Sequence, residues 1–369
     1  MEEQNDELDV LKARAQNGNA EAQFDIAIKY ENGEGVVQDN IQAVYWYRQA
    51  AEQGHAYAQT NLGDMYRLGL GVDQDYIQAE NLYIKAAEHG HADAQIELSY
   101  MYHTGKGVVQ DYTKAVYWYR QAAEQGHADA QFNLGNMYRR GLGVDQDFNQ
   151  AAEWYTLAVE QGDMDARFEL GFLYYYGEGV EQSYYKAAKL YRLAAYKGHA
   201  MAQIELGFLY TNGECVEQSY YKAFYWFTKA AKQGHAIAQF NIGIMYKNGE
   251  GVTQDKAKAV KWYTMAAKQE DAEAQNNLGF LYYNGEGVEK SYNKAFYWFT
   301  KAAKQGDAMA QFNLGDMYRF GINVAQDKAK AVMLFTHAAE QGHTCAQDTL
   351  KDMDSNGEIG VVGGGETKK

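Results

Sequence analysis

Histidine and aspartate side chains recur along the chain at an interval that raises the question of metal chemistry. Zinc ligands must converge within about 2.0–2.2 Å of one ion, whereas equivalent residues on successive packed helices lie about 8–10 Å apart. We therefore predict helix N-caps at these positions, where His and Asp are interchangeable as hydrogen-bond acceptors, and no metal site. The series, spaced by multiples of 36 residues, comprises His55, His91, His127, Asp163, His199, His235, Asp271, Asp307 and His343.

Other patterns typical of catalysis are missing or have a structural explanation. Acidic residues such as Asp93 and Asp129 lie early in the predicted helices and bases such as Arg139 and Arg140 lie late, as helix dipoles favour. No serine lies in G-x-S-x-G, and the G-x-G turns are not continued as a phosphate-binding loop. We expect neither enzymatic activity nor a cofactor.

These residues belong to a 36-residue repeat that recurs nine times between Ala20 and His343 without insertion or deletion. In the fourth repeat, apolar residues follow a 3.6-residue period in two stretches, from Ala130 to Tyr138 and from Ala151 to Val159. Each stretch therefore predicts an amphipathic helix. The expected fold is an all-α solenoid of nine helix-turn-helix repeats, which forms one elongated domain.

The flanking segments predict caps for this solenoid. Residues 8–19 match the second half of a repeat, so residues 1–19 predict an N-terminal capping helix, whereas residues 344–354 predict a polar C-terminal capping helix. The tail, residues 355–369, contains GVVGGG and is predicted to be disordered.

Glycine and tryptophan mark turn and core positions within the repeat. Gly141 is placed to end the first helix in the left-handed conformation, and Asp147 is a suitable N-cap for the second. Gly135 lies in mid-helix, which predicts close packing at a site where glycine is otherwise unfavourable. All six tryptophans occupy one repeat position, which predicts core packing, not a cofactor site: Trp46, Trp118, Trp154, Trp226, Trp262 and Trp298.

Three departures from the repeat make sharp local predictions. Glu270 replaces the glycine that ends every other second helix, so we expect that helix to run on or to end differently. Asn323 replaces the second turn glycine and should tolerate a left-handed conformation. Cys215 replaces the same glycine in the sixth repeat and should not.

Charge and cysteine content narrow the partners and the compartment. The net charge of −15 disfavours nucleic acid and anionic membrane surfaces. Cys215 and Cys345 lie almost four repeats apart, beyond the reach of a disulfide in a solenoid. No run of 18 apolar residues and no secretory signal is present, so we expect a cytoplasmic protein without membrane insertion.

The repeat resembles the Sel1-like repeat family, a relative of the tetratricopeptide repeat. The shared elements are A-x-A-Q-x-x-L-G-x-M-Y, G-x-G-V-x-Q-D and A-x-x-W-Y-x-x-A-A-x-Q-G, and the fourth repeat carries them between Ala128 and Gly162. The resemblance implies a right-handed superhelix whose first helices line a concave face. It also implies an adaptor or scaffold in protein complexes, often in signalling. Most family members have Pro after G-x-G-V, and this chain has none.

The variable positions of the first helices are the candidate partner-binding residues on that concave face. Bases dominate in repeats two to four and aromatic residues in repeats five to eight, which suggests a groove for an acidic–apolar protein segment. The aromatic side chains could instead pack against the next repeat. The candidates are Arg67, Tyr100, His103, Phe132, Asn136, Arg139, Arg140, Phe172, Tyr175, Tyr176, Phe208, Phe280 and Tyr283.

The sequence thus favours a non-enzymatic adaptor that binds a protein or peptide segment, and it leaves other functions open. The exposed aromatic residues could form a platform for a glycan or a peptidoglycan fragment. Hydrolytic activity has been suggested for disulfide-bearing relatives, but this chain lacks their cysteines.

Overall fold

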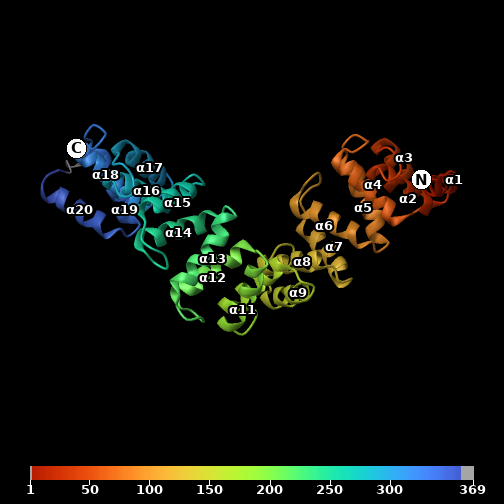
Figure 1. Ribbon diagram of the computed structural model, residues 1–369, viewed down its shortest axis with the longest axis horizontal. Helices are drawn as coiled ribbons and strands as arrows, with labels where there is room; N and C mark the ends of the chain where they lie inside the picture. Colours follow the sequence, from red (N-terminus) through yellow and green to blue (C-terminus); the bar gives the residue numbers. More distant parts are fainter. Residues whose placement is uncertain (1, 359–369) are drawn as a thin grey trace, which may run out of the picture. The chain divides into compact units, whose positions relative to one another are not determined.

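The described part of the chain is an all-α solenoid of helix-turn-helix repeats. The structure, a computed structural model, describes residues 2–358, and within that range it contains 20 helices and no strand (Figure 1). The chain forms two compact units, unit 1 (Met1–Leu190) and unit 2 (Tyr191–Lys369). From α1 to α10, and again from α12 to α20, each helix packs against the helix that follows it in the chain. The fold predicted from the repeat is confirmed.

Each repeat contributes a first and a second helix. The first helices are α2 (Ala20–Asn32), α4 (Ala56–Leu68), α6 (Ala92–Thr104), α8 (Ala128–Arg140), α10 (Met164–Tyr176), α12 (Ala200–Asn212), α14 (Ala236–Asn248), α16 (Ala272–Asn284) and α18 (Ala308–Phe320). The second helices are α3 (Asn40–Glu52), α5 (Tyr76–Glu88), α7 (Tyr112–Glu124), α9 (Phe148–Glu160), α11 (Tyr184–Tyr196), α13 (Tyr220–Lys232), α15 (Lys256–Ala267), α17 (Tyr292–Lys304) and α19 (Lys328–Glu340).

A single helix flanks the repeats at each end. The first, α1 (Glu2–Gln16), packs on α2, and the last, α20 (Thr344–Ser355), packs on α19. The segment 356–358 follows, and in it Glu358 lies 3.1 Å from Arg319 and 3.2 Å from Lys328. These ion pairs fix the start of the tail that the sequence predicts to be disordered. The rest of that tail, 359–369, lies outside the described residues.

The turn between the two helices of a repeat is held by three side-chain and backbone devices. Gly141 ends α8 with φ +66°, as predicted. The Gln146 side-chain amide then donates to the Arg139 carbonyl at 2.8 Å, so that one of the last carbonyls of α8 is satisfied. Asp147 accepts from the Asn149 and Gln150 amides and so caps α9. The G-x-G-V-x-Q-D motif therefore forms the turn between the two helices.

The mid-helix glycine makes room for an aromatic ring from the second helix of the same repeat. A Cβ added at Gly135 would lie 2.6 Å from Cε1 of Tyr155, which is closer than carbon atoms pack. The same approach occurs at Gly207, where the ring belongs to Phe227. The predicted close packing is confirmed, and these rings are the largest fully buried side chains of the core.

The tryptophans lie beside these rings. Trp226 is buried, and Trp46, Trp118, Trp154, Trp262 and Trp298 are half-buried against the core of a neighbouring repeat. Their packing agrees with the predicted structural role.

A row of buried glutamines joins successive repeats, and the sequence analysis missed it. Gln131 donates to the Ala123 carbonyl of the preceding second helix, and its own side-chain oxygen accepts from Gln161 at 2.7 Å. The same pair recurs between Gln95 and Gln125. In the second repeat His89 stands at the position of this second glutamine, as Lys197 does in the fifth, and the Gln59 oxygen is buried without a hydrogen bond.

The three non-glycine residues in tight turns keep the glycine conformation. The φ angle is +61° at Cys215, +63° at Glu270 and +64° at Asn323. The prediction for Asn323 is confirmed, and the prediction for Cys215 is wrong. The helix before Glu270 does not run on but ends one residue early, at Ala267. The Asp271 amide still donates to the Ala266 carbonyl, so hydrogen bonds around the turn enforce the left-handed angle.

Candidate partner-binding surface

The predicted N-caps divide into those that form and those that do not. His55, His199, His343, Asp163, Asp271 and Asp307 accept a hydrogen bond from the amide three residues on. The side chains of His91, His127 and His235 make no such bond, so the prediction is wrong there. For His91 the reason is another partner, because its Nδ1 lies 3.0 Å from the Thr60 hydroxyl. No three histidine, cysteine or acidic side chains gather as metal ligands would within residues 2–358.

We use "first-helix face" for the surface made by the 13 candidate residues and their repeat equivalents. Two of its arginines are neutralised within the fold. Arg67 lies 2.7 Å from Asp64 and 3.6 Å from Glu97 of the next first helix. Arg139 lies 3.5 Å from Glu169. Each of these arginines is thus paired with a carboxylate of the next repeat.

Polar residues of this face also serve the core tyrosines. The Tyr155 hydroxyl donates to the Asn136 side chain at 2.9 Å, so Asn136 is occupied within the fold. The Tyr83 hydroxyl donates to Asp64 at 2.8 Å and accepts from Arg67 at 3.0 Å. Burial raises the pKa of both tyrosines. Each ring belongs to a second helix, and its hydroxyl bonds to side chains on the first helix of the same repeat.

His103 and Arg140 behave differently from the paired arginines. Burial lowers the pKa of His103, and the positive charge of Arg140 lowers it further, so the imidazole is neutral at pH 7. Arg140 is exposed and makes no ion pair with any residue in the described part of the chain. Among the four basic candidates, Arg140 therefore carries the charge that remains available.

Most of the aromatic candidates are half-buried. Phe132 and Phe172 pack against the core of α9 and α10, and Phe208 meets Phe227 edge to face at 5.2 Å. Tyr175 and Tyr283 lie against Tyr184 and Tyr292, with ring centroids 5.2 and 5.1 Å apart. Four of these five meet a ring of the second helix of their own repeat, and whether any of the five contacts a partner stays a prediction.

Three aromatic candidates are clearly exposed. The relative accessibility is 48% at Tyr100, 56% at Tyr176 and 41% at Phe280. Lys247 lies over the Phe280 ring at 5.5 Å, and Phe172 contacts Tyr176 at 4.4 Å. These three residues, one on each of α6, α10 and α16, are the most exposed of the aromatic candidates.

A small cavity in unit 1 brings three of the candidates together. It has a volume of about 170 Å³ and is lined by His103 from α6 with Asn133, Asn136, Met137, Arg140 and Leu142 from α8 and the turn after it. Met137 is buried and Leu142 half-buried, which gives the cavity an apolar floor. Arg140 and His103 supply its polar rim. A cavity of this size suits one side chain and is smaller than sites for small-molecule ligands, about 300–1,000 Å³.

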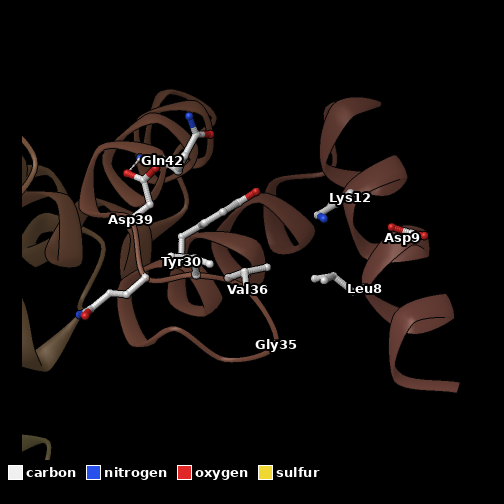
Figure 2. Close-up of a pocket in the computed structure, with 10 residues that line it drawn as sticks. Leu8, Asp9, Lys12, Tyr30, Gly35, Val36, Asp39 and Gln42 are labelled. Atoms are coloured by element: carbon white, nitrogen blue, oxygen red, sulfur yellow. Dashed lines mark hydrogen bonds between the residues drawn. The ribbon is translucent and has the colours of Figure 1, made fainter. Parts of the chain in front are cut away.

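A larger pocket near the N-terminus belongs to the repeat and not to one site. Figure 2 shows Leu8 and Lys12 of α1 across from Tyr30 of α2 and Val36 of the following turn, around about 660 Å³. A pocket of about 670 Å³ recurs 72 residues on, where Glu80, Tyr102 and Val108 take the places of Leu8, Tyr30 and Val36. The same kind of hollow thus forms at two places where a turn meets the preceding helix.

Comparison with known proteins agrees with the repeat pattern. The Sel1 repeat profile matches nine consecutive segments: residues 20–55, 56–91, 92–127, 128–163, 165–199, 200–235, 236–271, 272–307 and 308–343. The chain belongs to the Sel1 repeat family. Solenoids of Sel1 repeats are generally protein-interaction scaffolds.

Two solved Sel1 repeat structures are similar over most of the chain. One is a protective antigen present in uropathogenic Escherichia coli strains, which displays an SLR fold; it is 37% identical, with a TM-score of 0.76 over 95% of this chain and 83% of that chain. The other is a Sel1 repeat protein from Oxalobacter formigenes, 34% identical, with a TM-score of 0.66 over 86% of this chain and 94% of that chain. A search of curated proteins found no match.

Sequence reasoning missed the ion pairs between these Sel1 repeats, although a signal was present. Glu97 follows Arg67, and Glu169 follows Arg139, by 30 residues. That interval links the last turn of one first helix to the middle of the next. None of the helices formed by the described residues has the length and apolar character that a membrane span requires.

Proposed function

We propose that this Sel1 repeat protein is a non-enzymatic adaptor that binds an acidic–apolar segment of a partner protein on its first-helix face. The observation that carries the proposal is the cavity between α6 and α8, where an available arginine stands beside an apolar floor. The exposed Tyr100 lies on α6, three residues before His103, which lines the cavity.

The cavity fits a segment that has an apolar residue close to an acidic one. The apolar side chain fills the space over Met137 and Leu142, and the carboxylate pairs with the Arg140 guanidinium, whose planar fork suits it. His103, neutral at pH 7, adds a hydrogen-bonding group without adding charge. Tyr100 offers an exposed ring for further contact.

Electrostatics make this recognition short-ranged. The net charge of −15 repels an acidic segment at a distance. At physiological ionic strength, however, charges more than about 8 Å apart are largely screened. Binding therefore depends on local contact with Arg140, and we expect moderate affinity with slow association.

A second candidate function is glycan binding at Tyr176. This ring is exposed, and its centroid lies 4.4 Å from that of Phe172. An exposed aromatic ring offers a face on which a sugar ring can stack. The cavity beside Arg140 is too small for a saccharide, so the two functions use different residues.

Selection from a random peptide library tests the adaptor proposal even while the partner is unidentified. We expect enrichment of peptides with an acidic residue near an apolar one. Arg140→Ser combined with Tyr100→Ser should remove the enrichment. The control combines Tyr45→Ser and Arg48→Ser, exposed residues of α3 on a second helix, and should retain it.

Failure to enrich any peptide, or equal enrichment by both double variants, would overturn the adaptor proposal. Binding of saccharides on a glycan array, lost in Tyr176→Ser and retained in the Arg140 variant, would support the second candidate instead.

The two free, exposed cysteines are consistent with a reducing compartment, and we propose that the adaptor acts in the cytoplasm.

A further inference from the structure

The residue at the C-terminal end of the second helix is acidic in four repeats of unit 1 and basic in three repeats of unit 2, whereas the last repeat of unit 2 has Glu340 there. In unit 1 the last residue is glutamate in four successive repeats, which we call the glutamate row: Glu52, Glu88, Glu124 and Glu160. In unit 2 the equivalent residue is lysine in three successive repeats, which we call the lysine row: Lys232, Lys268 and Lys304. All seven side chains are exposed.

The glutamate row has no stabilising role within the fold. A negative charge at a helix C-terminus is unfavourable because the helix dipole is negative there. None of the four glutamates makes an ion pair with another residue of the described chain. Four repeated unfavourable charges on one surface need an explanation outside the chain.

The lysine row also lacks internal partners, in contrast to other lysines of the same helices. Lys222, Lys258 and Lys294, at the opposite ends of α13, α15 and α17, lie over tyrosine rings of the preceding first helix at 5.0–5.3 Å. Lys232, Lys268 and Lys304 make no such contact within residues 2–358. Their ammonium groups remain free to pair with another molecule.

Exposed apolar side chains flank both rows. Tyr45 and Tyr117 lie seven residues before Glu52 and Glu124, on the same face of their helices. Tyr225 and Tyr297 take the same places before Lys232 and Lys304. Each row is therefore the charged edge of a surface that also offers aromatic contact area.

We propose that the glutamate row of one copy of this chain binds the lysine row of a second copy. Both rows present one charge per 36-residue repeat on the same helical element, so their spacings match and several pairs form in one register. Because the contact joins two different rows, and each copy carries one row of each sign, the contact is heterologous and joins copies head to tail.

This self-association is independent of the adaptor function. It uses the second helices, whereas the proposed partner site lies on the first helices. The net charge of −15 opposes association at low ionic strength, but facing side chains lie within the screening length of about 8 Å at physiological salt. We expect a weak and reversible contact.

Sedimentation velocity over a concentration series tests the proposal on the full chain. The mean mass should rise with concentration, between about 10 and 200 µM, at about 0.15 M salt and fall back to the monomer at about 0.5 M. Lys232→Glu, Lys268→Glu and Lys304→Glu together should weaken association at least about tenfold, because the reversed charges repel the glutamate row.

The matched control reverses Lys222, Lys258 and Lys294 instead. It makes the same change in net charge on the same three helices and should leave association within about twofold of the wild type. A second variant, with all four glutamates of the glutamate row changed to lysine, should also fail to associate alone. Mixed with the lysine-row variant, it should form a complex.

Three results would overturn the proposal. A wild type that remains monomeric across the concentration series would show that the rows do not meet. Association that survives high salt, or that the lysine-row and control variants weaken equally, would assign it to other contacts. Helical circular dichroism, unchanged in all variants, excludes misfolding as the cause of any loss.

Discussion

The cores of the two units differ by one atom beneath the first-helix face. In unit 1 the ring beneath the mid-helix position is Tyr47, Tyr83, Tyr119 or Tyr155, whereas in unit 2 it is Phe227, Phe299 or Phe335, with Tyr191 and Tyr263 as the exceptions. Tyrosine brings a hydroxyl to the surface of the first helices, and this hydroxyl needs a partner. In the second and fourth repeats, polar residues of the first-helix face form hydrogen bonds with this hydroxyl.

The partners are visible in the surface residues. Tyr83 is served by Asp64 and Arg67, and Tyr155 by Asn136. Beside two of the phenylalanines of unit 2 the equivalent positions hold Phe208 and Phe280, whereas beside Phe335 the position holds Asp316. A surface that looks chosen for ligand recognition is therefore partly a consequence of internal hydrogen bonding. Residues such as Arg140 and Tyr100, which the core does not use, are better evidence of function.

The largest expected effect comes from placing a hydroxyl where unit 2 has none. Phe227→Tyr should lower the free energy of unfolding by about 1–3 kcal/mol, because the new hydroxyl would lie beside Phe208 without an acceptor. Urea denaturation measures the loss. Combining it with Phe208→Asn recreates the Tyr155–Asn136 pair, and a double-mutant cycle should give a favourable coupling of about 1 kcal/mol. A coupling energy of zero would contradict the role given to the hydroxyl in this comparison.

A smaller effect, of opposite sign, is expected at Tyr263. The Tyr263 hydroxyl is buried without a hydrogen bond, and its first-helix neighbour at the Asn136 position is Ile244. Tyr263→Phe should therefore raise the free energy of unfolding by up to about 1 kcal/mol. The matched Tyr83→Phe should lower it by about 1 kcal/mol, since it removes one of the two side-chain donors to Asp64. Equal effects in the two variants would contradict the role given to the hydroxyl.

The smallest effect concerns pH. Burial and Arg140 hold the pKa of His103 below its unfolded value of about 6.5. The folded state therefore binds this proton less readily, and stability falls as the pH drops from 7 to 5. His103→Gln should lose less stability over that range than the wild type, as thermal melts at both values would show. An identical pH dependence in the two proteins would mean that the pKa of His103 is the same in the folded and unfolded states.

Much of the fold was predictable because the repeat encodes it locally. Gly141, Gln146 and Asp147 specify the turn through hydrogen bonds within a few residues, and the apolar period specifies both helices. The errors arose where tertiary context overrides local preference. Glu270 and Cys215 keep a left-handed backbone because hydrogen bonds of the repeat around them enforce it.

The partner surface was less predictable, for a related reason. The sequence shows that Arg67, Arg139 and Arg140 are basic, but only the packing of successive repeats shows that two of them are neutralised. Likewise, Phe208 and Phe280 look equivalent in sequence, yet one packs against Phe227 and the other is exposed. Exposure and pairing depend on neighbours far away in the chain, which no local pattern specifies.

The most direct test of the adaptor proposal is the affinity of a selected acidic–apolar peptide for three forms of the protein. Fluorescence anisotropy should show Arg140→Ala binding at least about tenfold more weakly than the wild type, because a charge-assisted pair is lost. Arg48→Ala, which removes an exposed charge from α3, should bind within about twofold of the wild type. If both variants bind as tightly as the wild type, the first-helix face at Arg140 is not the partner site.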